Sequence, residues 1–148
     1  MILIDANLLL YAFDLSSPHH QAARRWLTAT LSSPEPVALA WATILAFLRL
    51  GTEPRLLRRP LTTAEASAIV SEWLERPNVT VLAPGERHWA LLNRLLAEGQ
   101  VKGALVTDAH LAALAIEHGA TVATVDRDFA RFPGLQFFNP LLSESNGR

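Results

Sequence analysis

Short apolar segments alternate with longer amphipathic segments along this chain, and this alternation restricts its fold more than any other feature. Short buried strands are expected at residues 2–5, 37–40, 79–83, 120–126 and 135–139. The helical spacing of apolar residues predicts helices at residues 16–31, 41–52, 62–76, 85–99 and 107–119. Helices between strands act as crossovers, so the strands are expected to be parallel. The pattern predicts an α/β fold, a three-layer α/β/α sandwich.

The length and composition fit one domain with one hydrophobic core. The chain has 148 residues, 50% of them apolar, with no internal repeat and no long linker. We expect a domain at 1–142 and a flexible tail at 143–148. No apolar run approaches the roughly 20 residues that span a bilayer, and the N-terminus lacks the basic segment of a signal peptide. A cytoplasmic protein with no membrane contact is expected.

The positions of the aspartates point to chemistry. The chain contains only five, of which Asp14 falls in a loop. Asp5 directly follows the first predicted strand, and Asp126 and Asp128 come at and just after the end of the fourth. Asp108 lies at the start of the predicted helix 107–119. In an open parallel sheet, ligands bind outside the carboxyl ends of the strands, so these side chains are expected to converge at one edge.

Each aspartate also has a purely structural interpretation. Asp108 is a good N-cap for its helix, and Asp126 and Asp128 fit Asx turns. Asp5 is harder to explain, because apolar residues flank it on both sides and an unpaired buried charge is costly. Carboxylates gathered in one crevice repel one another unless a cation lies between them, and such sites suit Mg²⁺ or Mn²⁺. We therefore interpret Asp5 as a metal ligand, with Asn7 orienting it or a bound water.

Three segments of the chain resemble PIN-domain proteins, specifically the VapC-like ribonuclease toxins of toxin–antitoxin pairs. They are ILIDANLLLYAFD at residues 2–14, WATILAFLRLGT at 41–52 and TDAHLAALAIEHGATVATVDRDFARF at 107–132. Each motif is weak alone, but their order and spacing are specific. The resemblance implies a five-stranded parallel sheet, dependence on Mg²⁺ or Mn²⁺ and cleavage of RNA. It also implies a homodimer and a VapB-like antitoxin as partner.

The resemblance also implies which residues form the site. The acidic positions of the family fall on Asp5, Asp108 and Asp126, with Asp128 nearby as a candidate fourth acid. In the expected metal-dependent endoribonuclease, these acids hold the metal directly or through water. Asn7 and Thr124 are expected to support them. No histidine is needed as a base, and the histidines show no metal-ligand spacing with a partner acid.

One departure from the family pattern leaves alternatives open. The family usually has a glutamate, in a pattern like L-A-E-L, where this chain has Phe47. With one acidic ligand fewer, the site can hold either one metal or two. The missing glutamate also keeps open a catalytically degenerate PIN fold that only binds RNA or a partner protein. A phosphatase of the haloacid-dehalogenase type fits less well. That chemistry needs D-x-D after the first strand and a supporting lysine, whereas this chain has Asn7 there and Lys102 as its only lysine.

The apolar surplus of the chain predicts an interaction surface. Four tryptophans and an apolar content of 50% exceed what one core hides, and large exposed apolar patches usually mark interaction sites. We expect the helix that carries Trp26 and the segment FLRLGTEPRLL at residues 47–57 to form a groove for an amphipathic antitoxin segment. No motif in the sequence indicates which RNA is cleaved, whether tRNA, rRNA or mRNA.

Overall fold

The computed structural model describes the backbone of residues 1–145 and the side chains of residues 1–142. The strands are β1 (Ile2–Ile4), β2 (Val37–Ala40), β3 (Val79–Leu82), β4 (Thr121–Ala123) and β5 (Phe137–Phe138). The helices are α1 (Ala6–Tyr11), α2 (His20–Leu31), α3 (Trp41–Gly51), α4 (Thr63–Glu75), α5 (His88–Glu98), α6 (Leu105–His118) and α7 (Pro140–Ser145), with a 3₁₀ helix, η1 (Arg127–Arg131).

The strands form one parallel sheet in the order β3-β2-β1-β4-β5, which confirms the predicted α/β fold. The central strand, β1, pairs with β4 so that Ile4 lies opposite Ala123. Asp5 and Thr124, the next residue of each strand, therefore leave the sheet side by side at its carboxyl edge. The sequence places the aspartates at the strand ends, and this pairing order brings two of those ends together.

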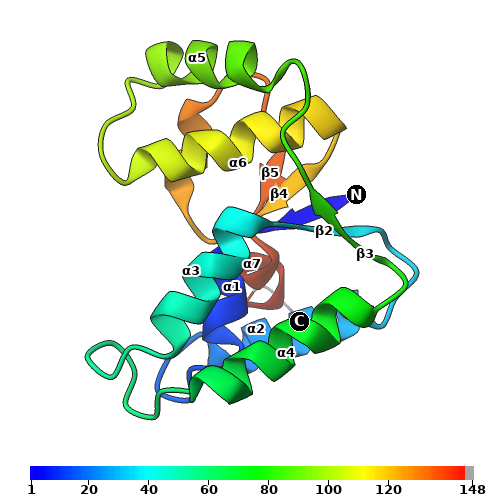
Figure 1. The fold of residues 1–148 in the computed structure, drawn as a ribbon, viewed down its shortest axis with the longest axis vertical. Coiled ribbons are helices and arrows are strands. Elements are labelled where there is room, and N and C mark those ends of the chain that lie inside the picture. The colour runs from blue at the N-terminus through cyan, green and yellow to red at the C-terminus, as the bar shows by residue number, and fades with distance from the viewer. Residues whose placement is uncertain (146–148) are drawn as a thin grey trace.

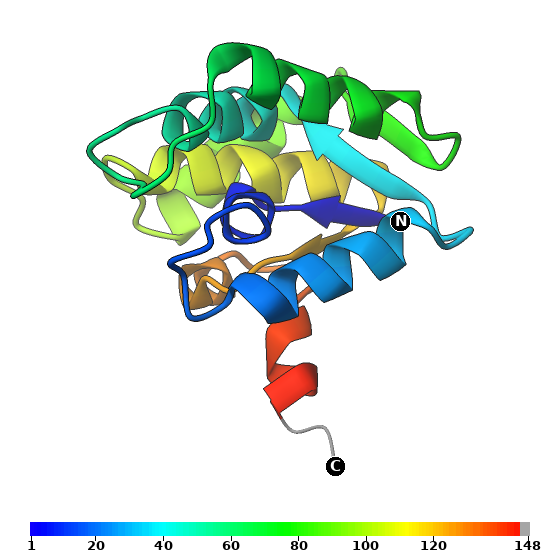
Figure 2. The ribbon, with the colours of Figure 1, turned by 90° about the horizontal axis from the view of Figure 1, so that it is seen from below.

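The sheet separates two hydrophobic layers, as the predicted sandwich requires. Alternate strand residues face opposite sides: Ile4 and Leu39 pack with α1, α2, α3 and α4, whereas Leu3 and Ala40 pack with α5 and α6. Figure 1 shows α5 and α6 on one side of the strands and α1 to α4 on the other. The short α7 packs beside α2 and extends away from the sheet (Figure 2).

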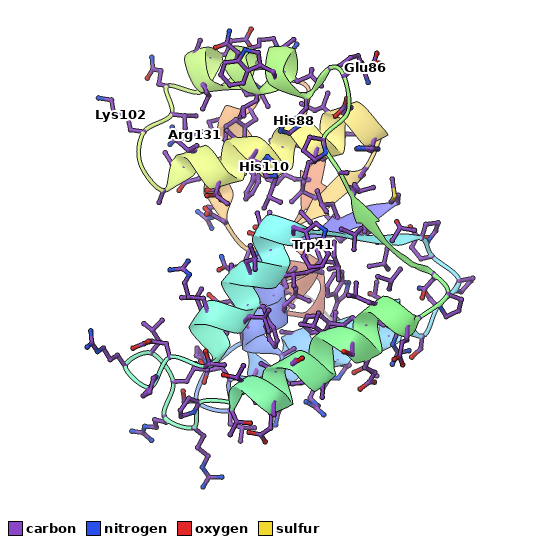
Figure 3. The ribbon with its side chains drawn as sticks, viewed as in Figure 1. Trp41, Glu86, His88, Lys102, His110 and Arg131 are labelled. Carbon is purple, nitrogen blue, oxygen red and sulfur yellow. The ribbon has the colours of Figure 1, made fainter. Side chains whose placement is uncertain are left out.

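The α5–α6 layer is also joined by polar contacts. The Glu117 carboxylate accepts hydrogen bonds from the backbone N–H groups of Gly85 and Arg87, at 2.9 and 3.1 Å. Nε2 of His88 lies 3.0 Å from Nδ1 of His110, between the two helices (Figure 3). His110 is two residues after Asp108, which places it about 200° around the helix from that aspartate. This histidine pair therefore fastens α5 to α6 on the side of α6 away from Asp108.

Several elements begin where the sequence signals do not place them. The expected helix at 16–31 starts only at His20, because the Ser17 hydroxyl accepts a hydrogen bond from the His19 N–H within a preceding turn. The short α1 and α7 are not in the predicted set. The expected tail at 143–148 overlaps α7 through Ser145, and residues 146–148 lie outside the described part of the chain. Within residues 1–145, no helix is long and apolar enough to cross a membrane.

The tryptophans divide between core and surface. Trp73 is buried, and Trp26 is partly buried with its ring edge-on to Phe138 at 6.5 Å. Trp41 and Trp89 are exposed by 56% and 66%. The exposed tryptophans thus lie on α3 and α5, and an antitoxin groove on the helix of Trp26 stays a prediction.

Phe47, at the position where the family usually has a glutamate, is a core residue. Its side chain is fully buried, with its ring centroid 4.8 Å from that of Trp73 and 5.7 Å from that of Phe13. The backbone position of the family's glutamate is therefore used here for packing between α3 and α4.

This packing predicts the effect of restoring the acid. Phe47→Glu should lower the free energy of unfolding by at least about 3 kcal/mol, because it removes a large buried ring and buries a carboxylate among aromatic rings. Phe47→Leu, which keeps an apolar side chain, should cost roughly 1 to 1.5 kcal/mol. Urea unfolding of both variants measures the difference. A Phe47→Glu protein as stable as Phe47→Leu would show that this side chain reaches a polar site.

Candidate active site

Asp5 and Thr124 join the ends of the two central strands. One carboxylate oxygen of Asp5, Oδ1, accepts the N–H of Ala6 at 2.8 Å, which makes Asp5 the N-cap of α1. The other, Oδ2, accepts the hydroxyl of Thr124 at 2.7 Å. Both side chains are buried, Thr124 almost completely. These partners explain how a carboxylate is accommodated within an apolar stretch, since each of its oxygens is hydrogen-bonded.

Asp126 is held next to this pair by the same threonine. The Thr124 hydroxyl oxygen accepts the backbone N–H of Asp126 at 3.0 Å. The Asp126 side chain in turn accepts the N–H of Asp128 at 2.8 Å and caps η1. This is the Asx turn that the sequence predicts for Asp126. The turn uses one oxygen of Asp126, and the other makes no hydrogen bond to any described residue.

Asp108 lies in the first turn of α6 and does not cap it. The helix begins at Leu105, with Ala104 as its N-cap residue and no side-chain capping bond, so the capping interpretation of Asp108 was wrong. The carboxylate of Asp108 is half-buried and makes no hydrogen bond to the described residues. It is therefore available for another role.

The negative charges of Asp5, Asp126 and Asp128 all act on Asp108. Burial raises the pKa of Asp108 to about 7, and the negative charges of Asp5, Asp126 and Asp128 contribute to that rise. Burial is also the main cause that raises the pKa of Asp5, with hydrogen bonds from Thr124 and Ala6 opposing it. We name these four aspartates the acidic cluster, and the convergence of Asp5, Asp108 and Asp126 on one metal position stays a prediction.

One cation, Arg131, acts on the acidic cluster, and the sequence analysis did not identify it. Its charge opposes the rise in the pKa of Asp108. One guanidinium nitrogen, Nη1, donates to the carbonyl of Gly99 at 2.8 Å, and Nη2 lies 3.6 Å from Oδ1 of Asp128. Figure 3 shows Arg131 beside α5 and α6. The available signal was its spacing of three residues after Asp128, which places both on one side of η1.

Asn7 lies in the first turn of α1, two residues after Asp5, and is half-buried. Its side chain makes no hydrogen bond to the described residues. Its role in orienting a ligand or a water stays a prediction, whereas Thr124 contacts Asp5 directly.

The donor set suits a hard divalent cation. Among the described residues, no three histidine, cysteine, aspartate or glutamate side chains are already arranged around one metal position. Mg²⁺ does not require such a cage, because it keeps several waters and is usually bound through one or two carboxylates. Among the described residues, Asp108 and Asp126 each have an oxygen without a hydrogen bond. Burial and the neighbouring negative charges raise the pKa of Asp108, and a cation would relieve the repulsion between these charges.

Comparisons with known proteins agree with this architecture. The family model for the PIN domain matches residues 2–135. Ribonuclease VapC37 from Mycobacterium tuberculosis is 43% identical over 140 residues, which cover 95% of this chain and 97% of that protein. Ribonuclease VapC33 from the same species is 41% identical over 141 residues, 95% of this chain and 99% of that protein. A toxin–antitoxin complex from Klebsiella pneumoniae has the same fold, with a TM-score of 0.65 at 20% identity over 95% of this chain and 98% of that chain.

The raised pKa of Asp108 predicts a pH-dependent stability of the metal-free protein. The folded chain holds the Asp108 proton more tightly than the unfolded chain, so this residue's contribution to the free energy of unfolding falls as the pH rises from about 4 to about 7. Asp108→Asn cannot ionise. Its stability relative to wild type should therefore be greater at pH 8 than at pH 4, measured by urea unfolding in EDTA.

Asp14→Asn is the matched control, because Asp14 lies in the loop after α1 and bonds to Ser16 rather than to the acidic cluster. The same stability difference between Asp108→Asn and wild type at both pH values would contradict the raised pKa of Asp108.

Proposed function

The chain belongs to the PIN-domain family, with VapC ribonucleases as relatives over 95% of its length, and we propose that it is a divalent-metal-dependent endoribonuclease. The observation that carries this proposal is the acidic cluster at the carboxyl edge of the sheet, in a chain 43% identical to a named ribonuclease. The reaction is hydrolysis of a phosphodiester bond in RNA, with Mg²⁺ or Mn²⁺ as cofactor. We place this activity in the cytoplasm.

The three acids are held by different hydrogen bonds, and we assign their roles accordingly. Asp5 is fixed by Ala6 and Thr124 and provides a rigid, buried oxygen pair. Asp108 makes no hydrogen bond to the described residues and is the acid best able to turn toward a cation. Asp126 offers its second oxygen from a capped turn. A divalent cation bound by these acids supplies a water of lowered pKa and neutralises charge on the phosphate.

The partners follow from the same family membership. We propose that the protein is the toxin of a toxin–antitoxin pair, bound by a VapB-like antitoxin and active on RNA as a homodimer. The support on this chain is an exposed apolar face on α3, formed by Trp41, which Figure 3 labels, and Leu45. These side chains are 56% and 60% exposed and lie one helical turn apart. We name these two residues the α3 face. Exposed apolar side chains adjacent on one helix are typical of association surfaces.

The nuclease proposal is tested on purified protein with labelled single-stranded RNA. Wild-type protein should cleave the RNA with Mg²⁺ or Mn²⁺ and lose cleavage in EDTA. Asp108→Asn should reduce the rate on the order of 100-fold or more, because it removes a charge that the cation requires. The same variant should remain folded by circular dichroism, since Asp108 makes no hydrogen bond within the described part of the chain.

Asp14→Asn again serves as control and should cleave at the wild-type rate. Undiminished cleavage in EDTA, or full activity of Asp108→Asn, would sink the proposed mechanism. If every protein binds RNA and none cleaves it, the chain is the catalytically degenerate PIN protein instead.

The dimer proposal is tested at the α3 face. Replacing both Trp41 and Leu45 by serine should shift the protein from dimer to monomer in sedimentation velocity experiments, because it removes the apolar area that association buries. Trp89→Ser, on α5, is the control for loss of an exposed tryptophan. A wild-type monomer, or a dimer that survives the double substitution, would show that the α3 face has another purpose.

A further inference from the structure

We propose that a pocket beside the acidic cluster binds one base of the RNA substrate, an inference that rests on the proposed function and deepens it. The pocket has a volume of about 570 Å³, within the range of small-molecule sites. Residues from the end of α1, the segment after β4 and the segment from β5 to α7 line it. Asp126 belongs both to this lining and to the acidic cluster, so a nucleotide in the pocket has its backbone next to the acids.

The walls of the pocket offer rings for stacking. Tyr11, His19 and Phe137 all line it, and the rings of Tyr11 and His19 are 5.1 Å apart with an angle of 39° between their planes. His19 and Phe137 are exposed, so neither ring is buried in the hydrophobic core. Single-stranded RNA is commonly held by stacking its bases on Phe, Tyr, Trp or His side chains. Three such rings around one pocket match that mode of binding.

Polar groups at the pocket complete a nucleotide site. Oδ1 of Asn139 accepts the backbone N–H of Leu141 at 2.9 Å, which fixes the orientation of the amide. The amino group of Asn139 therefore remains as the donor for an acceptor on a base edge. Arg127 is exposed and also lines the pocket, where its guanidinium can pair with a phosphate. Stacking rings, a base-edge donor and a phosphate partner thus lie together.

Two larger pockets on the protein are less suited to this substrate. One, of about 700 Å³, is lined along α2, and the other, of about 730 Å³, lies before β2 and β3 at the amino edge of the sheet. None of their described lining residues is acidic, so neither adjoins the acidic cluster. An apolar antitoxin segment is the competing occupant of the 570 Å³ pocket. The shared Asp126 and the clustered rings favour the base.

The experiment pairs a ring removed from the protein with a base removed from the RNA. The wild-type cleavage site is first mapped on a random-sequence single-stranded RNA with Mn²⁺, and oligonucleotides are then made with one abasic residue at each position around it. At one position, the abasic change should lower kcat/KM of wild type by roughly 5- to 150-fold, the range expected for one stacked base. His19→Ala should be slower on intact RNA and insensitive to that same abasic change.

His19→Phe keeps a ring and should restore sensitivity to the missing base. Gln21→Ala, exposed in the first turn of α2 and outside the pocket, should behave as wild type. Binding is measured separately by fluorescence anisotropy of the Asp108→Asn protein with intact and fully abasic RNA of equal length. Intact RNA should bind at least about fivefold more tightly.

The outcomes separate this inference from the nuclease proposal. If wild type cleaves RNA but no abasic position matters, the base subsite is overturned and the nuclease proposal stands. If no RNA is cleaved, the nuclease proposal fails, and equal anisotropy with intact and abasic RNA then overturns the subsite as well. Loss of antitoxin binding by His19→Ala, with RNA binding unchanged, would assign the pocket to a peptide and also overturn the inference.

Discussion

The hydroxyl of Thr124 is the connection on which the site depends. It donates to the carboxylate of Asp5 and accepts from the backbone of Asp126, so one small side chain fixes the ends of β1 and β4 relative to each other. Threonine suits this position because a hydroxyl is both donor and acceptor, whereas a carboxylate or an ammonium group offers only one role. The substitution Thr124→Val keeps the shape of the side chain but would leave both of these polar groups without their partner.

Close to this connection, the fold brings negatively charged carboxylates together, which is electrostatically unfavourable. Burial and three neighbouring carboxylates raise the pKa of Asp108 to about 7, and Arg131 compensates only in part. Titratable groups whose pKa is shifted in this way are concentrated at functional sites, because such a shift does not by itself stabilise the fold. Asp5 differs from Asp108 in this respect, since its two hydrogen bonds also begin α1.

Much of this arrangement can be predicted from the sequence, because it follows from the periodicity of the apolar residues. Strand and helix alternation predicts the parallel sheet, and an aspartate immediately after a buried strand must lie at the carboxyl edge. Other features depend on contacts between segments far apart. The start of α6 at Leu105 lacks any capping side chain, so Thr107 and Asp108 gave the stronger but misleading signal. The position of Arg131 depends on its contact with the distant Gly99, and the pocket lined by Asn139 depends on the pairing of β4 with β5.

The different anchoring of the acids has an evolutionary consequence. Asp5 is bonded to the start of a helix and to a neighbouring strand, so replacing it would weaken the fold and, if the proposed function holds, lower activity as well. Asp108 contributes charge and makes no hydrogen bond to the described residues, so replacing it with a neutral residue would ease repulsion and, if the proposed function holds, remove activity. A bacterial lineage that loses its antitoxin is under pressure to silence the toxin gene. If the proposed function holds, a single substitution at position 108 of this chain would be enough to give an inactive descendant that still folds.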